Sequence, residues 1–115
     1  MKYSDINILI KDKSWHKILT LWAAACAEHV LPWVEEKVPN DMRPRKAIEA
    51  AKEWVNDELK MLDARKAAFA AHAAARETEN KSAIAAARSA GHAAATAHVA
   101  IQYMLLTMHA KLSNF

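Results

Sequence analysis

The chain has 115 residues, of which 53% are hydrophobic and 25% are charged, and its formal net charge is +3. A chain of this length and composition can bury one core, which argues against a disordered protein and indicates a single globular domain. Basic and acidic residues are interspersed, so the small positive excess argues against nucleic-acid binding.

The cysteine count and the hydropathy pattern bear on the compartment. Cys26 is the only cysteine and cannot form an internal disulfide, and the first residues lack the pattern of a signal peptide. The least polar stretch, residues 93–106, contains His98 and Gln102 and is too short and too polar to span a membrane. We therefore expect a cytoplasmic protein that does not enter a membrane.

Glycine and proline are scarce, with one and three residues, and alanine dominates the second half of the chain. A sheet would need turn residues between its strands, and these are largely missing. The sequence predicts an all-α fold, a compact antiparallel bundle of four to five helices that forms one domain over residues 1–115. The apolar patch at residues 6–10 fits either a helical turn or an N-terminal arm within residues 1–13.

The first long helix is predicted from the spacing of its apolar residues. Ser14 fits an N-cap, and apolar or weakly polar residues follow at steps of three and four. They form a stripe that we expect to be buried: Trp15, Ile18, Leu19, Trp22, Cys26, His29, Val30 and Trp33. Pro32 lacks an amide hydrogen, so the helix should end or bend there before a short continuation to Lys37.

Three further helices are expected. Asn40 or Asp41 can cap the second, which has Pro44 in its first turn. Its apolar face comprises Ile48, Ala51, Val55, Leu59 and Leu62. The third begins near Asp63 and ends near Arg76, residues 77–81 form a polar turn, and the fourth covers residues 82–112.

Alanine strings in the third and fourth helices predict thin helices that pack as a tight antiparallel pair. Gly91 either bends the fourth helix or lets a neighbouring backbone approach closely, and we favour close packing. The tryptophans Trp15, Trp22, Trp33 and Trp54 are expected to provide the bulk that alanine lacks in the core.

The histidines are candidates for a metal site. His92 and His98 are six residues apart and so do not share a helix face. A site would need His72 from the neighbouring helix together with Glu77 or Glu79. We therefore predict no metal and no cofactor.

The same histidines fit a structural role better. His72 and Arg76, like His92 and Thr96, are four residues apart and adjacent on a helix face. With His98 they are expected to form a polar patch between helices, in which the groups satisfy one another or nearby carbonyls.

Catalytic machinery is not visible in the sequence. Cys26 lies on the predicted apolar stripe and is expected to be a buried small hydrophobe. The carboxylates occur mainly at solvent-facing helix positions, and no glycine-rich loop is present to bind a phosphate. No catalytic residue is predicted, and the protein is not expected to be an enzyme.

Four segments resemble the immunity proteins of bacterial polymorphic toxin systems. They are LWAAACAEHVLPWVEEKVP (21–39), DMRPRKAIEAAKEWV (41–55), ARKAAFAAHAAAR (64–76) and AARSAGHAAATAHV (86–99). The most specific parts are RPRKAIEAA and GHAAATAHV, because alanine strings alone match many helices. The resemblance implies a small helical cytoplasmic protein that protects its producer by binding and blocking a cognate protein toxin, and it supplies no catalytic residues.

Under this hypothesis the partner-binding surface is expected around the proline-bounded turn after the first long helix, where tryptophan, arginine and carboxylates gather. Its residues are Trp33, Glu35, Glu36, Asp41, Arg43 and Arg45. The alternative is a capped helix junction with a core tryptophan.

Two other functions stay open. A DNA-associated helical module would need Arg43, Arg45 and Lys46 to lie beside further cations. A homodimer could form through the apolar end of the fourth helix, at Tyr103, Met104, Leu105, Leu106 and Met108.

Overall fold

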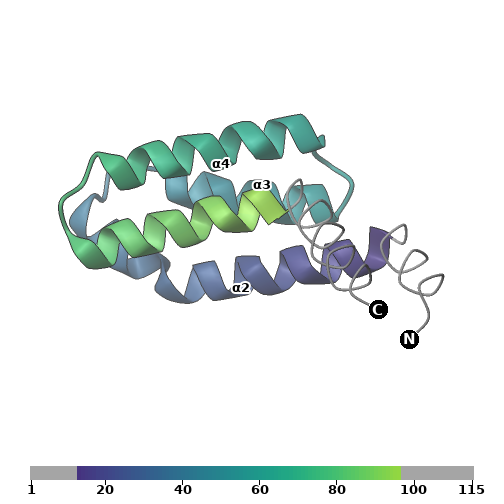
Figure 1. The fold of residues 1–115 in the computed structure, drawn as a ribbon, viewed down its shortest axis with the longest axis horizontal. Coiled ribbons are helices and arrows are strands. Elements are labelled where there is room, and N and C mark those ends of the chain that lie inside the picture. Colours follow the sequence, from purple (N-terminus) through teal and green to yellow (C-terminus); the bar gives the residue numbers. More distant parts are fainter. Residues whose placement is uncertain (1–12, 97–115) are drawn as a thin grey trace, which may run out of the picture.

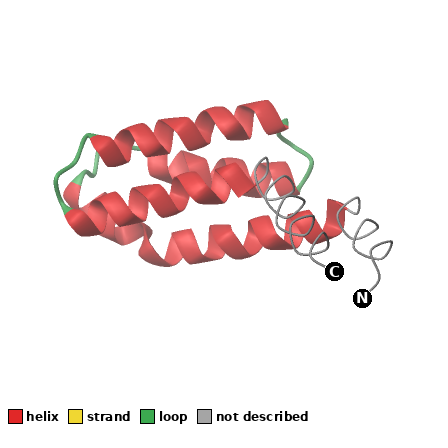
Figure 2. Cartoon of the chain, viewed as in Figure 1, coloured by secondary structure: helices red, strands yellow, loops and turns green. Residues whose placement is uncertain are grey.

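The computed structural model describes residues 13–96, with side chains from residue 16 onward. Within this part the chain is all-helical and contains no strand, which confirms the predicted fold class. The helices are α2 (Lys13–Lys37), α3 (Arg43–Val55), α4 (Met61–Arg76) and a helix over residues 81–96. Successive helices run in opposite directions and pack into one compact bundle (Figures 1 and 2).

α2 continues through Pro32 and ends at Lys37, as predicted for the continuation, and of the two outcomes expected at Pro32, an end or a bend, the end is excluded. Leu31 and Val34, on either side of the proline, are both buried in the core. Pro32 itself is exposed, and the amide of Val38 donates to the carbonyl of Val34 at 2.8 Å. Burial of the two neighbours outweighs the hydrogen bond that proline removes.

The N-cap of α3 is Met42, which forms no side-chain cap hydrogen bond, so the prediction of Asn40 or Asp41 as the N-cap is wrong, whereas Pro44 lies in the first turn as predicted. The amide of Arg43 donates to Oδ1 of Asp41 at 3.0 Å, and Pro44 occupies the first turn, where its missing amide costs nothing.

α3 ends at Val55, so the prediction that its apolar face includes Leu59 and Leu62 is wrong. Asp57 then adopts a positive φ of 60°. Aspartate tolerates this left-handed conformation better than most residues, and it reverses the chain toward α4.

The helix over residues 81–96 begins at a side-chain cap. Oδ1 of Asn80 accepts a hydrogen bond from the amide of Ala83 at 2.9 Å. The helix passes through Gly91 without interruption. A Cβ at this position would lie 2.8 Å from Cε1 and Nε2 of His72 on α4. The glycine therefore provides room for close packing, the alternative that the sequence favoured.

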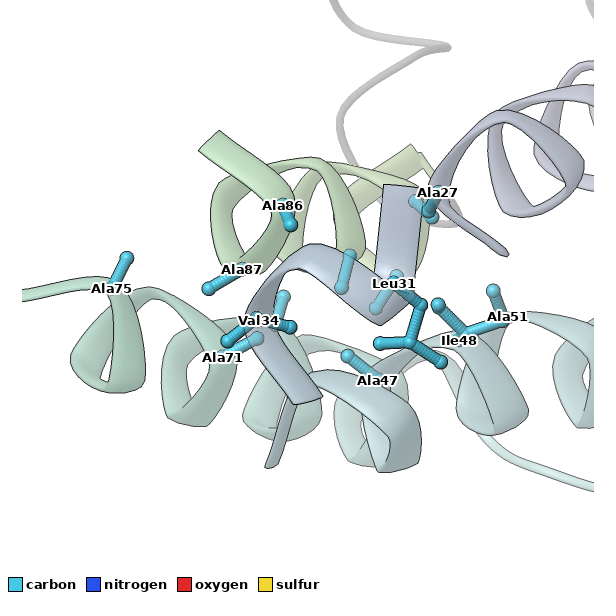
Figure 3. Close-up of a cluster of buried hydrophobic side chains, with 14 of the residues drawn as sticks. Ala27, Leu31, Val34, Ala47, Ile48, Ala51, Ala71, Ala75, Ala86 and Ala87 are labelled. Atoms are coloured by element: carbon cyan, nitrogen blue, oxygen red, sulfur yellow. The ribbon is translucent and has the colours of Figure 1, made fainter. Parts of the chain in front are cut away.

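The core consists mainly of alanine. Apart from Leu31, Val34 and Ile48, every buried hydrophobic side chain of the described part is an alanine. Figure 3 shows Leu31 and Val34 from α2 lying among alanines of α3, α4 and the helix over residues 81–96. Alanine faces let helices approach near the lower end of the usual spacing of about 8–10 Å.

The face of α2 that enters this core is not the predicted one. The buried residues of α2 are His16, Thr20, Ala24, Ala27, Leu31 and Val34. From the predicted stripe, Ile18 and Trp22 are 56% and 69% exposed, and Cys26 and His29 are also exposed. Trp33 is 49% exposed, so the predictions of a buried Cys26 and of core tryptophans at 22 and 33 are wrong. The neighbouring helices contact α2 mainly through alanine side chains and therefore lie close to it. The space between them is too narrow for an indole ring.

Several predictions concern residues outside the described part of the chain. These are the N-terminal arm, the fourth helix beyond residue 96, His98, and the apolar segment with Tyr103 and Met108.

Candidate protein-binding surface

The turn between α2 and α3 lies at the same end of the bundle as the last turn of α4 (Figure 1). Arg43 joins them, because its guanidinium binds two carboxylates. Nε and Nη2 of Arg43 donate to Oδ1 and Oδ2 of Asp41 at 2.9 and 2.6 Å. Nη2 also donates to Glu77, the residue that follows the last turn of α4. These hydrogen bonds to Arg43 lower the pKa of Asp41 and of Glu77.

A second arginine pair crosses from α3 to α2. Nε and Nη2 of Arg45 donate to the two carboxylate oxygens of Glu35 at 2.7 and 2.6 Å. This two-point contact lowers the pKa of Glu35 and fixes the orientation of both side chains. Lys52 and Glu28 form another ion pair between the same two helices.

The two ion pairs bring four of the six predicted partner-binding residues to one end of the α2–α3 hairpin, namely Glu35, Asp41, Arg43 and Arg45. Trp33 and Glu36 lie on the last turns of α2 at the same end, on a different side of the helix from Glu35. We call the six residues the hairpin-end surface. Asp41 with Arg43 and Glu35 with Arg45 form two separate ion pairs. Trp33 and Glu36 are both exposed, which contradicts the alternative of a core tryptophan.

Two hollows flank the hairpin-end surface, and both are lined by its ion pairs. One, of about 470 Å³, lies between the α2–α3 turn and the end of α4, with Asp41, Arg43 and Glu77 in its wall. The other, of about 420 Å³, lies between α2 and α3 beside Glu35 and Arg45. A side chain of a partner could enter either hollow and meet polar groups that are already held in place.

The sequence did not suggest Glu28, Lys52 or Glu77 for this surface, and it indicated Glu77 only as a possible metal ligand. Residue 40 lies in the turn between the antiparallel helices α2 and α3, so residues equally far from it along the chain lie side by side. Glu28 and Lys52 are each twelve residues from residue 40, and their pairing could have been predicted in this way. Glu35 and Arg45 are likewise each five residues from it. Nothing local in the sequence brings Glu77 to Arg43, since that contact depends on where α4 ends.

The predicted histidine patch is partly assembled in the described part. The rings of His72 and His92 meet edge to face, with centroids 4.9 Å apart. Oγ1 of Thr96 donates to the carbonyl of His92 at 2.7 Å. Burial lowers the pKa of His72, and the positive charges of His92, Arg76 and Arg88 lower it further. Among residues 13–96, no group of three histidine, cysteine or acidic side chains is placed to hold a metal ion.

His16 forms a contact that the sequence did not suggest. Its Nε2 donates to the carbonyl of Thr96 at 2.6 Å, and its ring meets Trp54 edge to face at 4.7 Å. The ring is buried, so this hydrogen bond joins α2 to the helix over residues 81–96 inside the protein.

An exposed apolar surface runs along α2 in the described part of the chain, and we call it the α2 outer face. It comprises Ile18, Leu21, Trp22, Cys26, His29 and Trp33, with Ala25 and Pro32 between them. Glu28 is the only charged residue that is exposed between residues 18 and 33, and it pairs with Lys52. None of the helices in the described part has the length and apolar character that crossing a membrane requires.

Comparison with known proteins gives one assignment. A family model described as Imm-5 like putative immunity protein matches residues 9–111. The chain matches no curated protein and no solved structure. Since the family model covers most of the sequence, the chain belongs to the Imm-5 like putative immunity protein family.

Proposed function

We propose that this chain is a cytoplasmic immunity protein that binds a cognate bacterial toxin and blocks it by protein–protein contact, without a catalytic step. Membership of the immunity family over residues 9–111 is the observation that carries this proposal. The hairpin-end surface is the proposed site of contact.

The chemistry of this surface suits recognition of a protein. Tryptophan and arginine are the residue types that most often dominate binding energy at interfaces, and Trp33, Arg43 and Arg45 lie close together along the chain. Both arginines are held by carboxylates before any partner arrives. Less side-chain entropy is then lost on binding, which favours affinity.

Charge adds little to the encounter. The six residues carry three carboxylates and two guanidinium groups, and most of these neutralise one another in ion pairs. We infer that affinity comes mainly from burial of Trp33 and filling of the flanking hollows, with weak dependence on salt. The pairing of both arginines also weakens the DNA-associated alternative, because the phosphates of a duplex would have to displace carboxylates.

The test uses the toxin domain encoded beside the gene of this chain in its source genome. The purified chain should bind that domain and restore growth of cells that express it. Trp33→Ala and Glu36→Arg should each raise the dissociation constant by about thirtyfold, the effect of losing a strong interface contact.

Phe69→Ala is the matched control, because Phe69 is an exposed aromatic residue on α4, and it should bind the toxin like wild type. Circular dichroism would confirm that all variants are folded. Absence of binding and of protection by the wild-type chain would reject the function. Normal binding by Trp33→Ala and Glu36→Arg would reject only the placement of the surface.

A further inference from the structure

The α2 outer face has the character of an interface rather than of a solvated helix surface. Trp22 and Ile18 are 69% and 56% exposed, and they belong to a stripe that runs to Trp33. At a rise of 1.5 Å per residue, the stripe from Ile18 to Trp33 is about 22 Å long. Solvated helix faces normally carry charged residues, and contiguous apolar patches of this kind mark contact sites.

We propose that the α2 outer face binds the same face of a second copy of this chain, with the two α2 helices antiparallel about a twofold axis near Ala25 and Cys26. The neutrality of the face favours this partner. Two copies meet without repulsion between like charges, whereas a strongly charged partner would find no opposite charge between residues 18 and 33 except Glu28, which is already paired.

The order of large and small residues fits this symmetry. An axis between residues 25 and 26 brings Ile18 opposite Trp33 of the second copy and Trp22 opposite His29. The small residues Ala25 and Cys26 then meet at the centre, where they allow the helices to approach closely. Each bulky ring faces a smaller or flat side chain, and the same pairs recur on both sides of the axis.

The exposed tryptophans of the face supply part of the area that a dimer interface buries. The two tryptophans, at 69% and 49% exposure, offer roughly 200–250 Å² together if each ring can bury about 200 Å². This is about a third of the roughly 800 Å² that each partner of a specific interface buries. Ile18 and Leu21, at 56% and 46% exposure, add further apolar area on the same face.

Trp33 belongs to both the hairpin-end surface and the α2 outer face, so the toxin and a second copy would compete for this side chain. The first experiment therefore measures the oligomeric state of the purified chain without any toxin, which keeps its result separate from the test of the proposed function. Wild type should sediment as a dimer. Trp22→Lys places a charge on the face and should raise the dimer dissociation constant at least about thirtyfold. Phe69→Lys, at an exposed aromatic residue on α4, should remain dimeric.

The second experiment uses the only cysteine of the chain as a probe of the axis. A short bismaleimide should join two copies through Cys26, because both thiols lie near the twofold axis. The double variant Cys26→Ser, Lys66→Cys moves the thiol to an exposed position on α4 and should not crosslink, although its sedimentation should still show a dimer.

A monomeric wild type that does not crosslink at Cys26 would overturn the proposal. A dimer that Trp22→Lys leaves intact would overturn it as well, since the interface would then lie elsewhere. If the wild type is monomeric and Trp22→Lys abolishes toxin binding, the α2 outer face belongs to the toxin and not to a second copy.

Discussion

At the scale of single residues, His72 shows how close packing changes the acidity of a side chain. Its ring fills the space left by the missing side chain of Gly91 and contacts the ring of His92. Burial disfavours the charged imidazolium, and Arg76, Arg88 and His92 add repulsion, so the pKa of His72 lies below its ordinary value of 6.5.

This shift predicts how stability depends on pH. The unfolded chain binds a proton at His72 near the ordinary pKa, whereas the folded chain resists it. The folded state should therefore keep its full stability above about pH 6.5 and lose stability as the pH falls below that value. Urea unfolding between pH 7.5 and 5.5, followed by circular dichroism, measures the slope.

The variant His72→Gln separates this histidine from the other titrating groups. Glutamine keeps a polar side chain but cannot take up a proton in this range, so the free energy of unfolding should fall less steeply with decreasing pH. An unchanged slope in the variant would show that His72 does not contribute to the acid sensitivity.

At the scale of helices, α2 is attached to its neighbours by two kinds of polar contact. Exposed ion pairs such as Lys17 with Asp57, at 2.9 Å, link it to the α3 side, and each is worth about 0–1 kcal/mol. The buried hydrogen bond from His16 to the carbonyl of Thr96 links it to the helix over residues 81–96. Losing a buried partner costs more, because the remaining group is left without water.

Substitution at neighbouring positions of α2 compares the two contacts. His16→Ala removes the hydrogen bond and the packing of the ring on Trp54, and it should lower the free energy of unfolding by about 1–3 kcal/mol. Lys17→Ala removes only the exposed ion pair and should cost less than about 1 kcal/mol. Chemical denaturation measures both, and equal effects would contradict the structural role of His16.

At the scale of the whole molecule, the bundle is held together by alanine faces rather than by large side chains. Helices that approach this closely have little free volume between them, so an added side chain must displace a neighbouring helix. Ile18, Trp22 and Trp33 of α2 consequently lie outside the core, which takes only Leu31 and Val34 among the large apolar side chains described in this helix. The close approach of the helices therefore explains both the alanine-rich core and the exposed apolar side chains of α2.

Ala87 and Ala85 test this description with one substitution at two positions of the same helix. Ala87 is fully buried and Ala85 is exposed. Ala87→Leu should destabilise the protein by at least about 2 kcal/mol through overpacking, whereas Ala85→Leu should change the free energy of unfolding by less than about 0.5 kcal/mol. Similar values for both variants in thermal or urea unfolding would show that the core has free space.

Local chemistry in the sequence was enough to determine the helices and several of their ends. The scarcity of glycine and proline excluded a sheet, Pro44 marked the start of α3, and the alanine strings predicted close packing at Gly91. These features depend on residues a few positions apart, whose interactions are the same in any tertiary context.

Only the tertiary structure decided which face of α2 is buried. The helix is apolar on two sides, and both sides repeat every three to four residues, so periodicity could not distinguish the face of Ala24 and Ala27 from the face of Trp22 and Cys26. The choice depends on the depth available between neighbouring helices. That depth is shallow because α3, α4 and the helix over residues 81–96 also present alanine, and it therefore excluded the tryptophan face from the core.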